Sequence, residues 1–145
     1  MTKKDIERIF GEACRILYHD NQKYIDEEAN EESIVPFMTP YLKSQFKGYD
    51  VVNGYNREGP IKNDGSKRDP KRDIEGNCIY PDIIVHQYGP EGENLVAIEV
   101  KGYWNTEPRS HDEKKLRGLH SKQGYKFIYR IELGKDMAEL IEVEP

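Results

Sequence analysis

The chain has no long apolar run, and this absence limits its relation to membranes. No stretch approaches the roughly 20 apolar residues that cross a bilayer, and the N-terminal residues 1–17 lack the uninterrupted apolar segment of a signal peptide. We therefore expect a cytoplasmic protein with no membrane partner. With 145 residues the chain is long enough for one hydrophobic core and too short for two full-sized ones, so residues 1–145 are expected to form a single domain.

Ligand patterns built from cysteine or histidine are missing as well. The two cysteines, Cys14 and Cys78, lie far apart and neither belongs to a CxxC pair, which argues against a disulfide framework or a zinc site. The four histidines have no metal-ligand spacing and support neither a histidine-based nuclease nor a Ser/His/Asp hydrolase. We expect reduced thiols and a chemistry that depends on other residue types.

Basic charge is scarce in the whole chain but locally concentrated. The net charge of −5 argues against a nucleic-acid partner, because phosphate binding depends on Lys and Arg. Residues 109–130 nevertheless hold seven basic side chains against two acidic ones, a local balance of +5. This segment is suited to face phosphate. A solvated helix face balanced by acidic neighbours is the commoner meaning of such a charge run.

Hydrophobic periodicity predicts the order helix, helix, three strands, helix, two strands. Polar residues 20–30 are expected to be a linker, and Pro36 and Pro40 weaken the second helix because an interior proline removes a hydrogen bond. Residues 57–78 lack periodicity and are expected to form a long loop. The order predicts an α/β sandwich, one mixed sheet flanked by helices. The expected helices cover residues 5–18, 30–46 and 111–123, and the expected strands cover residues 49–56, 81–88, 94–102, 125–133 and 138–144.

The segment YPDIIVHQYGPEGENLVAIEVKG, residues 80–102, is typical of an antiparallel hairpin with a turn near Pro90 and Glu91. Paired residue numbers then sum to 181, which sets His86 opposite Leu95 and Asp82 opposite Glu99. Because side chains alternate between the faces of a strand, one face becomes a continuous apolar surface for a helix to cover. That face consists of Ile83, Val85, Val96, Ile98 and Val100.

The opposite face of the hairpin gathers Asp82, Glu99 and Lys101 at the end away from the turn. Directly opposed side chains have Cβ atoms about 5 Å apart, and two ionised carboxylates at that distance repel by roughly 3 kcal/mol at an effective dielectric constant near 20. Lys101 offsets part of this repulsion. A divalent cation such as Mg²⁺, held between both carboxylates, offsets far more, and a shared proton is the third option.

These residues resemble the PD-(D/E)XK nucleases, the restriction-endonuclease-like superfamily. The pattern of that family, Pro-Asp on one strand and then (Asp/Glu)-X-Lys on the next, is matched by Pro81-Asp82 and by Glu99-Val100-Lys101. The resemblance extends from the helix containing NEESIV to the strand after DEKKLRGL, and is strongest to small standalone members. It implies a restriction-endonuclease-like fold with the core order α-β-β-β-α-β.

The resemblance also implies a catalytic set. Asp82, Glu99 and the backbone carbonyl of Val100 would ligate Mg²⁺, with Mn²⁺ as a substitute, and Lys101 would position the attacking water and help to deprotonate it. Members often add a glutamate from the preceding helix. Glu31 is our choice for that role and Glu32 the second, although a carboxylate is favoured at a helix N-terminus in any case. The Gln-x-x-x-Tyr element of the exonuclease branch is absent from the sequence, so the cleavage mode stays open.

Four further residues are candidates for contacts with nucleic acid. Lys71 and Arg72 in the long loop are suited to hold a phosphate backbone, and Trp104 is suited to stack on an unpaired base. Lys115, on the helix after the motif, is able to reach phosphate. Each has an ordinary alternative: a solvated loop for Lys71 and Arg72, core packing for Trp104 and a surface position for Lys115.

The sequence therefore predicts a Mg²⁺-dependent nuclease that hydrolyses phosphodiesters, with DNA favoured over RNA. The alternative is a nuclease-fold domain that no longer cuts and serves as a nucleic-acid-binding or assembly module. The clustered acids favour the enzyme, because a pure binding module has no need of acids that repel phosphate. The net negative charge of the chain favours the module, or an enzyme that depends on a homodimer or a partner protein for its affinity for DNA. Hydrolysis of a smaller phosphate ester is the third possibility.

Overall fold

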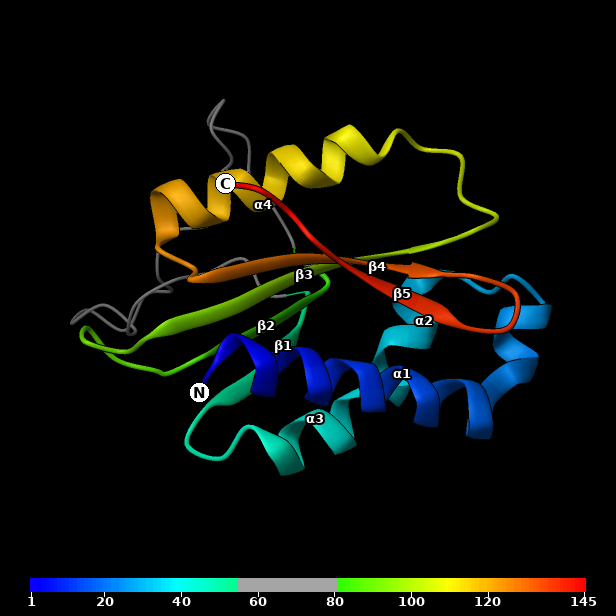
Figure 1. The fold of residues 1–145 in the computed structure, drawn as a ribbon, viewed down its shortest axis with the longest axis horizontal. Helices are drawn as coiled ribbons and strands as arrows, with labels where there is room; N and C mark the ends of the chain where they lie inside the picture. Colours follow the sequence, from blue (N-terminus) through cyan, green and yellow to red (C-terminus); the bar gives the residue numbers. More distant parts are fainter. Residues whose placement is uncertain (55–80) are drawn as a thin grey trace, which may run out of the picture.

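A computed structural model describes residues 1–54 and 81–145, which form an open sheet with helices on both faces (Figure 1). The sheet has the strand order β1-β2-β3-β4-β5, in which β3 and β4 are parallel and the other neighbours are antiparallel. The helical elements are α1 Lys3–Asp26, α2 Glu31–Ile34, a 3₁₀ turn Val35–Phe37, α3 Thr39–Gln45 and α4 Arg109–Gln123. The strands are β1 Asp50–Asn53, β2 Ile83–His86, β3 Asn94–Gly102, β4 Phe127–Leu133 and β5 Ala138–Glu142.

The predicted element order is confirmed, and with it the general class of an α/β fold with a mixed sheet. Helix α4 connects the parallel strands β3 and β4, as a crossover between parallel neighbours requires. The expected loop over residues 57–78, with Lys71 and Arg72, lies outside the described residues. The finer assignment to the restriction-endonuclease-like fold stays a prediction.

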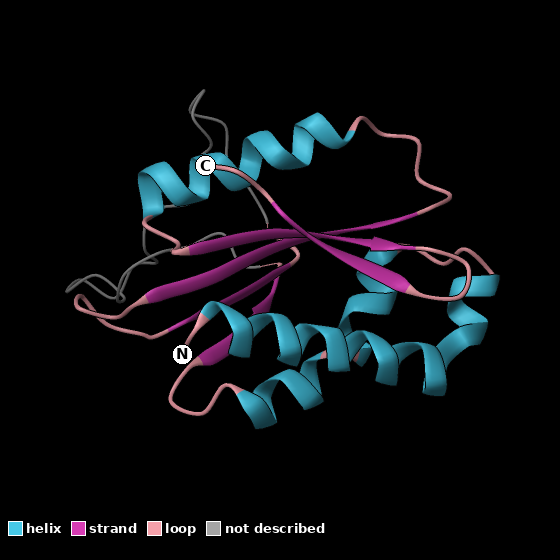
Figure 2. Cartoon of the chain, viewed as in Figure 1, coloured by secondary structure: helices cyan, strands magenta, loops and turns pink. Residues whose placement is uncertain are grey.

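The two faces of the sheet are covered by different helices (Figure 2). Helices α1 and α3 lie on one face, where Phe10 and Leu42 belong to the same buried cluster as Ile98. Helix α4 lies on the other face, where Leu116 and Leu119 pack with strand residues in a second cluster. As predicted, Ile83, Val85, Val96, Ile98 and Val100 all belong to the first cluster, because alternate side chains of a strand share one face.

The hairpin register is confirmed over most of its length and wrong near the turn. Ile83, Ile84 and Val85 pair with partners whose residue numbers sum to 181. An irregularity between Val85 and His86 then shifts the pairing, so that His86 lies opposite Asn94 and not opposite Leu95. A bulge of this kind adds one residue to one strand, which periodicity alone does not reveal.

Both N-terminal helices differ from their expected bounds. The polar segment predicted as a linker continues α1 to Asp26, with a kink at Asn21, because Ile25 extends the buried stripe by two turns beyond Leu17. The second helix is broken into α2, the 3₁₀ turn and α3, and Pro36 and Pro40 lie in the first turns of the last two. Proline is tolerated there because the first N–H groups of a helix have no partner within it.

The structure bears on two expectations drawn from the composition, namely the reduced thiols and the lack of a membrane-spanning segment. Cys14 is a buried free thiol, and burial raises its pKa to about 12, while Cys78 lies outside the described residues. Within residues 1–54 and 81–145, no helix has the length and apolar character needed to cross a membrane.

Ile98 tests the layer arrangement, since it is fully buried in the cluster between the sheet and α1. We expect Ile98→Ala to lower the free energy of unfolding by about 2–5 kcal/mol, because it leaves a cavity in that layer. Met137→Ala, at a side chain that is 74% exposed, is the control and should change it by less than about 0.5 kcal/mol. Urea denaturation of both variants measures the difference, and equal effects would contradict the arrangement.

Candidate functional site

Asp82 lies immediately before β2, at the point where the hairpin register brings it beside β3. The Val100 amide donates a hydrogen bond of 2.7 Å to Asp82 Oδ2, which fixes the carboxylate against the neighbouring strand. Glu99 precedes Val100 and points to the same face of the sheet as Ala97, the face covered by α4. The hairpin therefore brings the two carboxylates together, as the register predicts.

Of the two carboxylates, Glu99 is the more deeply buried and is only 2% exposed. Burial raises its pKa well above the usual range, and the negative charge of Asp82, together with a hydrogen bond from the protonated Glu99 carboxyl to Asp82, raises it further. Lys115 of α4 opposes this shift, with Nζ 3.7 Å from Glu99 Oε1. That oxygen has no hydrogen-bond partner among the described residues.

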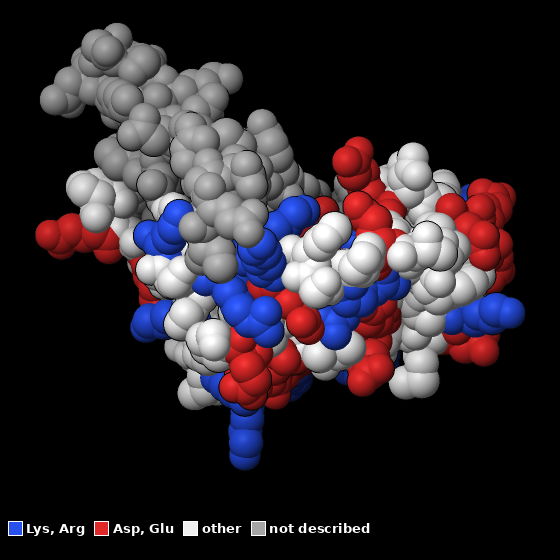
Figure 3. Space-filling model, turned by 90° about the horizontal axis from the view of Figure 1, so that it is seen from above, with Lys and Arg blue, Asp and Glu red and all other residues white. Residues whose placement is uncertain are grey.

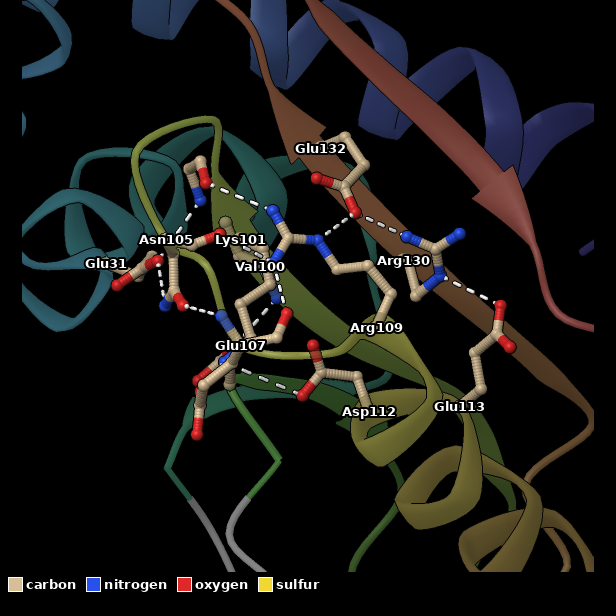
Figure 4. Close-up of polar contacts among 12 residues, drawn as sticks. Glu31, Val100, Lys101, Asn105, Glu107, Arg109, Asp112, Glu113, Arg130 and Glu132 are labelled. Carbon is tan, nitrogen blue, oxygen red and sulfur yellow. Dashed lines mark hydrogen bonds and ion pairs between the residues drawn. The ribbon is translucent and has the colours of Figure 1, made fainter.

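Lys101 is two residues beyond Glu99 in the sequence, and its side chain lies among acidic side chains. Its Nζ lies 2.7 Å from Glu107 Oε2 and 3.7 Å from Asp112 Oδ1, and its side chain is 14% exposed (Figure 4). Burial by itself would lower the pKa of Lys101, but the hydrogen bond to Glu107 and the charges of Asp112, Glu107 and Glu99 outweigh it and raise the pKa. Lys101 is therefore an ammonium at neutral pH.

The two helix glutamates lie in different surroundings. Glu31 Oε1 accepts hydrogen bonds from the Gly102 amide, at 3.1 Å, and from Asn105 Nδ2, at 2.9 Å. Burial opposes ionisation of Glu31, but these bonds prevail and lower its pKa. Glu32 instead lines a cavity of about 350 Å³ together with Asp82, and this cavity is also bordered by Val35, Asn53 and Gly54.

The loop after β3 is held by a network of side chains that Figure 4 displays. Arg109 Nη1 donates to the carbonyls of Asn105 and Glu107, each at 2.9 Å, and its Nε donates to Glu132 at 2.7 Å. Arg130 also donates to Glu132 and, at 3.1 Å, to Glu113. The network ties α4 and β4 to the loop that carries Glu107, the partner of Lys101.

The basic segment 109–130, which the sequence leaves open between facing phosphate and forming a balanced helix face, is largely engaged in ion pairs. Ion pairs with acids involve Arg109, Lys115, Arg117, Lys126 and Arg130; Lys115 pairs with Glu99, for example, and Lys126 with Glu93. On the face seen in Figure 3, Lys and Arg side chains are intermingled with Asp and Glu. This arrangement agrees with the alternative meaning, a balanced helix face.

Trp104 packs in the structure. Its ring lies so close to Gly102 that a Cβ at that position would come within 2.4 Å of it, and the side chain is partly buried against the main cluster. Its neighbour Tyr103 contacts it edge to face, with ring centroids 5.1 Å apart, and is the more exposed of the two. The alternative of core packing therefore describes Trp104 in this structure.

The oxygen donors present fit a small divalent cation only in part. Among the described residues, no group of three or more His, Cys, Asp or Glu side chains is placed to hold a metal ion. A cation here would depend on Asp82, Glu99, the Val100 carbonyl and water, which are the hard oxygen ligands that Mg²⁺ prefers. The observation that favours this arrangement is Glu99 Oε1, which is buried and has no hydrogen-bond partner among the described residues, with Lys115 Nζ 3.7 Å away.

Sequence reasoning missed Asp112 and Glu107 as neighbours of Lys101. Asp112 has a signal in the sequence, because it precedes Leu116 by four residues and Leu119 by seven and therefore lies on the apolar face of the helix. Glu107 has no such signal, since only the path of the loop brings it to Lys101.

Comparison of the chain with protein-family models, with curated proteins and with solved structures finds no significant match. The relation to the PD-(D/E)XK nucleases therefore remains an interpretation of residues and geometry.

The raised pKa of Glu99 predicts that the stability of the metal-free protein depends on pH. Because its pKa is raised above 4.5 on folding, the folded chain keeps a proton that the unfolded chain has lost, and stability falls as pH rises from 4.5 toward the raised value. The Glu99→Gln variant avoids this loss of stability, because glutamine does not ionise. We therefore expect the melting temperature of the variant, relative to wild type, to be higher at pH 8 than at pH 5 in the presence of EDTA.

Glu139→Gln, at an exposed position of β5, is the matched control, and its difference from wild type should not grow with pH. Thermal unfolding is sensitive enough, because about 1 kcal/mol shifts the midpoint by about 2–4 °C for domains near this size. A difference for Glu99→Gln that is the same at both pH values would contradict the burial of an ionisable Glu99.

Proposed function

We propose that the chain is a metal-dependent nuclease of the restriction-endonuclease-like fold, with Asp82, Glu99 and Lys101 as its catalytic residues. The observation that carries the proposal is the contact of Asp82 with Glu99 on adjoining strands, with Lys101 two residues farther along the same strand. A structural role alone explains such a group poorly, because two adjacent, partly buried carboxylates are unfavourable unless a proton or a cation compensates them.

Each residue has a distinct role in the proposal. Asp82, Glu99 and the Val100 carbonyl would hold Mg²⁺, which when bound would supply charge stabilisation at the phosphoryl oxygens and a water of lowered pKa. Lys101, kept as an ammonium by Glu107 and Asp112, orients that water and stabilises negative charge on the phosphate. In this arrangement Lys101 carries no free lone pair with which to accept a proton, so its part in deprotonation is indirect.

The cavity beside Asp82 favours Glu32 over Glu31 as the helix glutamate. Glu32 borders the same cavity of about 350 Å³ as Asp82, which leaves room for a hydrated cation, whereas Glu31 is engaged with Gly102 and Asn105. Glu31, the first choice from the sequence, then positions the loop after β3. Glu32 contributes to the cation site through water.

DNA is the proposed substrate, and affinity for it has to come from more than α4. Because most basic residues of the segment 109–130 are paired with acids, few charges on that segment are available for phosphate. The same observation weakens the alternative of a pure nucleic-acid-binding module. It leaves room for a homodimer or a partner protein that supplies the missing positive charge.

Catalysis is tested with linear, circular and single-stranded DNA and with RNA, each incubated with Mg²⁺, Mn²⁺ or EDTA. We expect cleavage that requires the cation, and a fall of about a hundredfold or more for Asp82→Asn, Glu99→Gln and Lys101→Met, because the first two remove a ligand charge for the cation and the third removes the positive charge beside the phosphate. Glu139→Gln, at an exposed site on β5, is the control and should cut like wild type. Absence of cleavage on every substrate, or variants as active as wild type, would overturn the proposal.

Cation binding is tested separately by calorimetric titration with Mn²⁺. Asp82→Asn should weaken binding, because it removes a ligand charge, and Glu32→Gln should weaken it several-fold, because Glu32 borders the same cavity. Glu31→Gln should leave the Mn²⁺ affinity within about twofold while lowering the melting temperature, since the acceptor of its hydrogen bonds to the loop loses its charge and the bonds weaken. The reverse order of the two helix variants would return the ligand role to Glu31.

A further inference from the structure

Asp112 is a buried carboxylate on the apolar face of α4. It is 1% exposed and lies one and two helical turns before Leu116 and Leu119, which pack on the sheet. A charged group in such a position is strongly unfavourable unless another charge compensates it. The position of Asp112 therefore requires a partner on the strand beneath the helix.

That partner is Lys101. Asp112 Oδ1 lies 3.7 Å from Lys101 Nζ, and Asp112 Oδ2 has no hydrogen-bond partner in the part of the chain that the structure describes. Glu107 also pairs with Lys101, at the shorter distance of 2.7 Å, but it is 61% exposed, so water screens its charge. Asp112 approaches from the interior and is shielded from solvent.

A second ion pair runs in the opposite direction between the same two elements. Lys115 of α4 lies 3.7 Å from Glu99 of β3, while Lys101 of β3 reaches Asp112 of α4. The two pairs cross the interface between β3 and α4 in addition to the apolar contacts of Leu116 and Leu119. Loss of Asp112 leaves Lys101 paired with the exposed Glu107.

We propose that Asp112 is a positioning residue of this site, which holds the Lys101 ammonium at the strand–helix interface beside Asp82 and Glu99. The catalytic part of this inference rests on the proposed function, because that function defines the reaction in which Lys101 acts. The interaction between Asp112 and Lys101 can be measured without that reaction. Asp112 touches neither the phosphate nor the cation in this role and acts only through Lys101.

The kinetic test compares Asp112→Asn, which keeps the shape of the side chain and removes its charge, with wild type on the DNA substrate that is cut best. We expect kcat to fall by about 10–100-fold, as is typical when an outer-shell partner of a catalytic group is removed, with KM within about twofold. Glu113→Gln is the matched control, because Glu113 adjoins Asp112 on α4 but pairs with Arg130 and Arg117. Its kcat should stay within about twofold of wild type.

A structural test uses the metal-free protein and needs no activity. Asp112→Asn, Lys101→Met and the double variant are unfolded in urea, and the shifts of the midpoints are compared. Asp112→Asn removes the buried partner of Lys101, and Lys101→Met removes the lysine that Asp112 Oδ1 approaches to 3.7 Å, so the double variant should be less destabilised than the sum of the two single shifts. Asp112→Ser, which keeps a polar group in less space, replaces Asp112→Asn if the latter does not fold.

The outcomes separate the two proposals. Additive midpoint shifts, or an Asp112→Asn variant with unchanged kcat, would overturn the positioning role. A wild-type protein that cuts no nucleic acid overturns the proposed function. In that case the coupling energy between Asp112 and Lys101 in the urea experiment decides whether Asp112 positions the Lys101 ammonium.

Discussion

The antiparallel pairing of β2 with β3 is the constraint on which the rest of the site depends. Its register places Asp82, just before β2, beside Glu99 in the interior of β3, and the Val100 amide binds the Asp82 carboxylate. A slip of one residue would exchange the two faces of the strand and bury Glu99 in the apolar layer under α1. The apolar residues that fix the register, such as Ile98, therefore also fix the acids.

The acids brought together in this way need compensation, and the chain supplies it from α4. Glu99 and Asp112 are nearly inaccessible to water, and each lies opposite a lysine of the other element. Burial, together with the neighbouring charge of Asp82, raises the pKa of Glu99, so that Glu99 keeps its proton to a higher pH than an exposed glutamate does. Proton, lysine and cation are three ways to balance one group of negative charges.

The distribution of basic residues follows from the same requirement. In residues 109–130 most Lys and Arg side chains neutralise buried or neighbouring acids, and the net charge of the chain stays at −5. Those charges build the site and cannot also form a broad surface for a phosphate backbone. A nucleic acid, the substrate proposed above, would therefore have to be recognised mainly at the site itself or with help from further positive charge.

The sequence by itself determined the order of the elements and the apolar face of the hairpin, because period and burial are local properties of a strand or helix. Only the tertiary structure decided the shift of His86 to Asn94, the extension of α1 to Asp26 and the distinct surroundings of Glu31. Each depends on contacts between distant segments. The pairing of Lys101 with buried Asp112 is of the same kind, since it joins a strand to the helix above it.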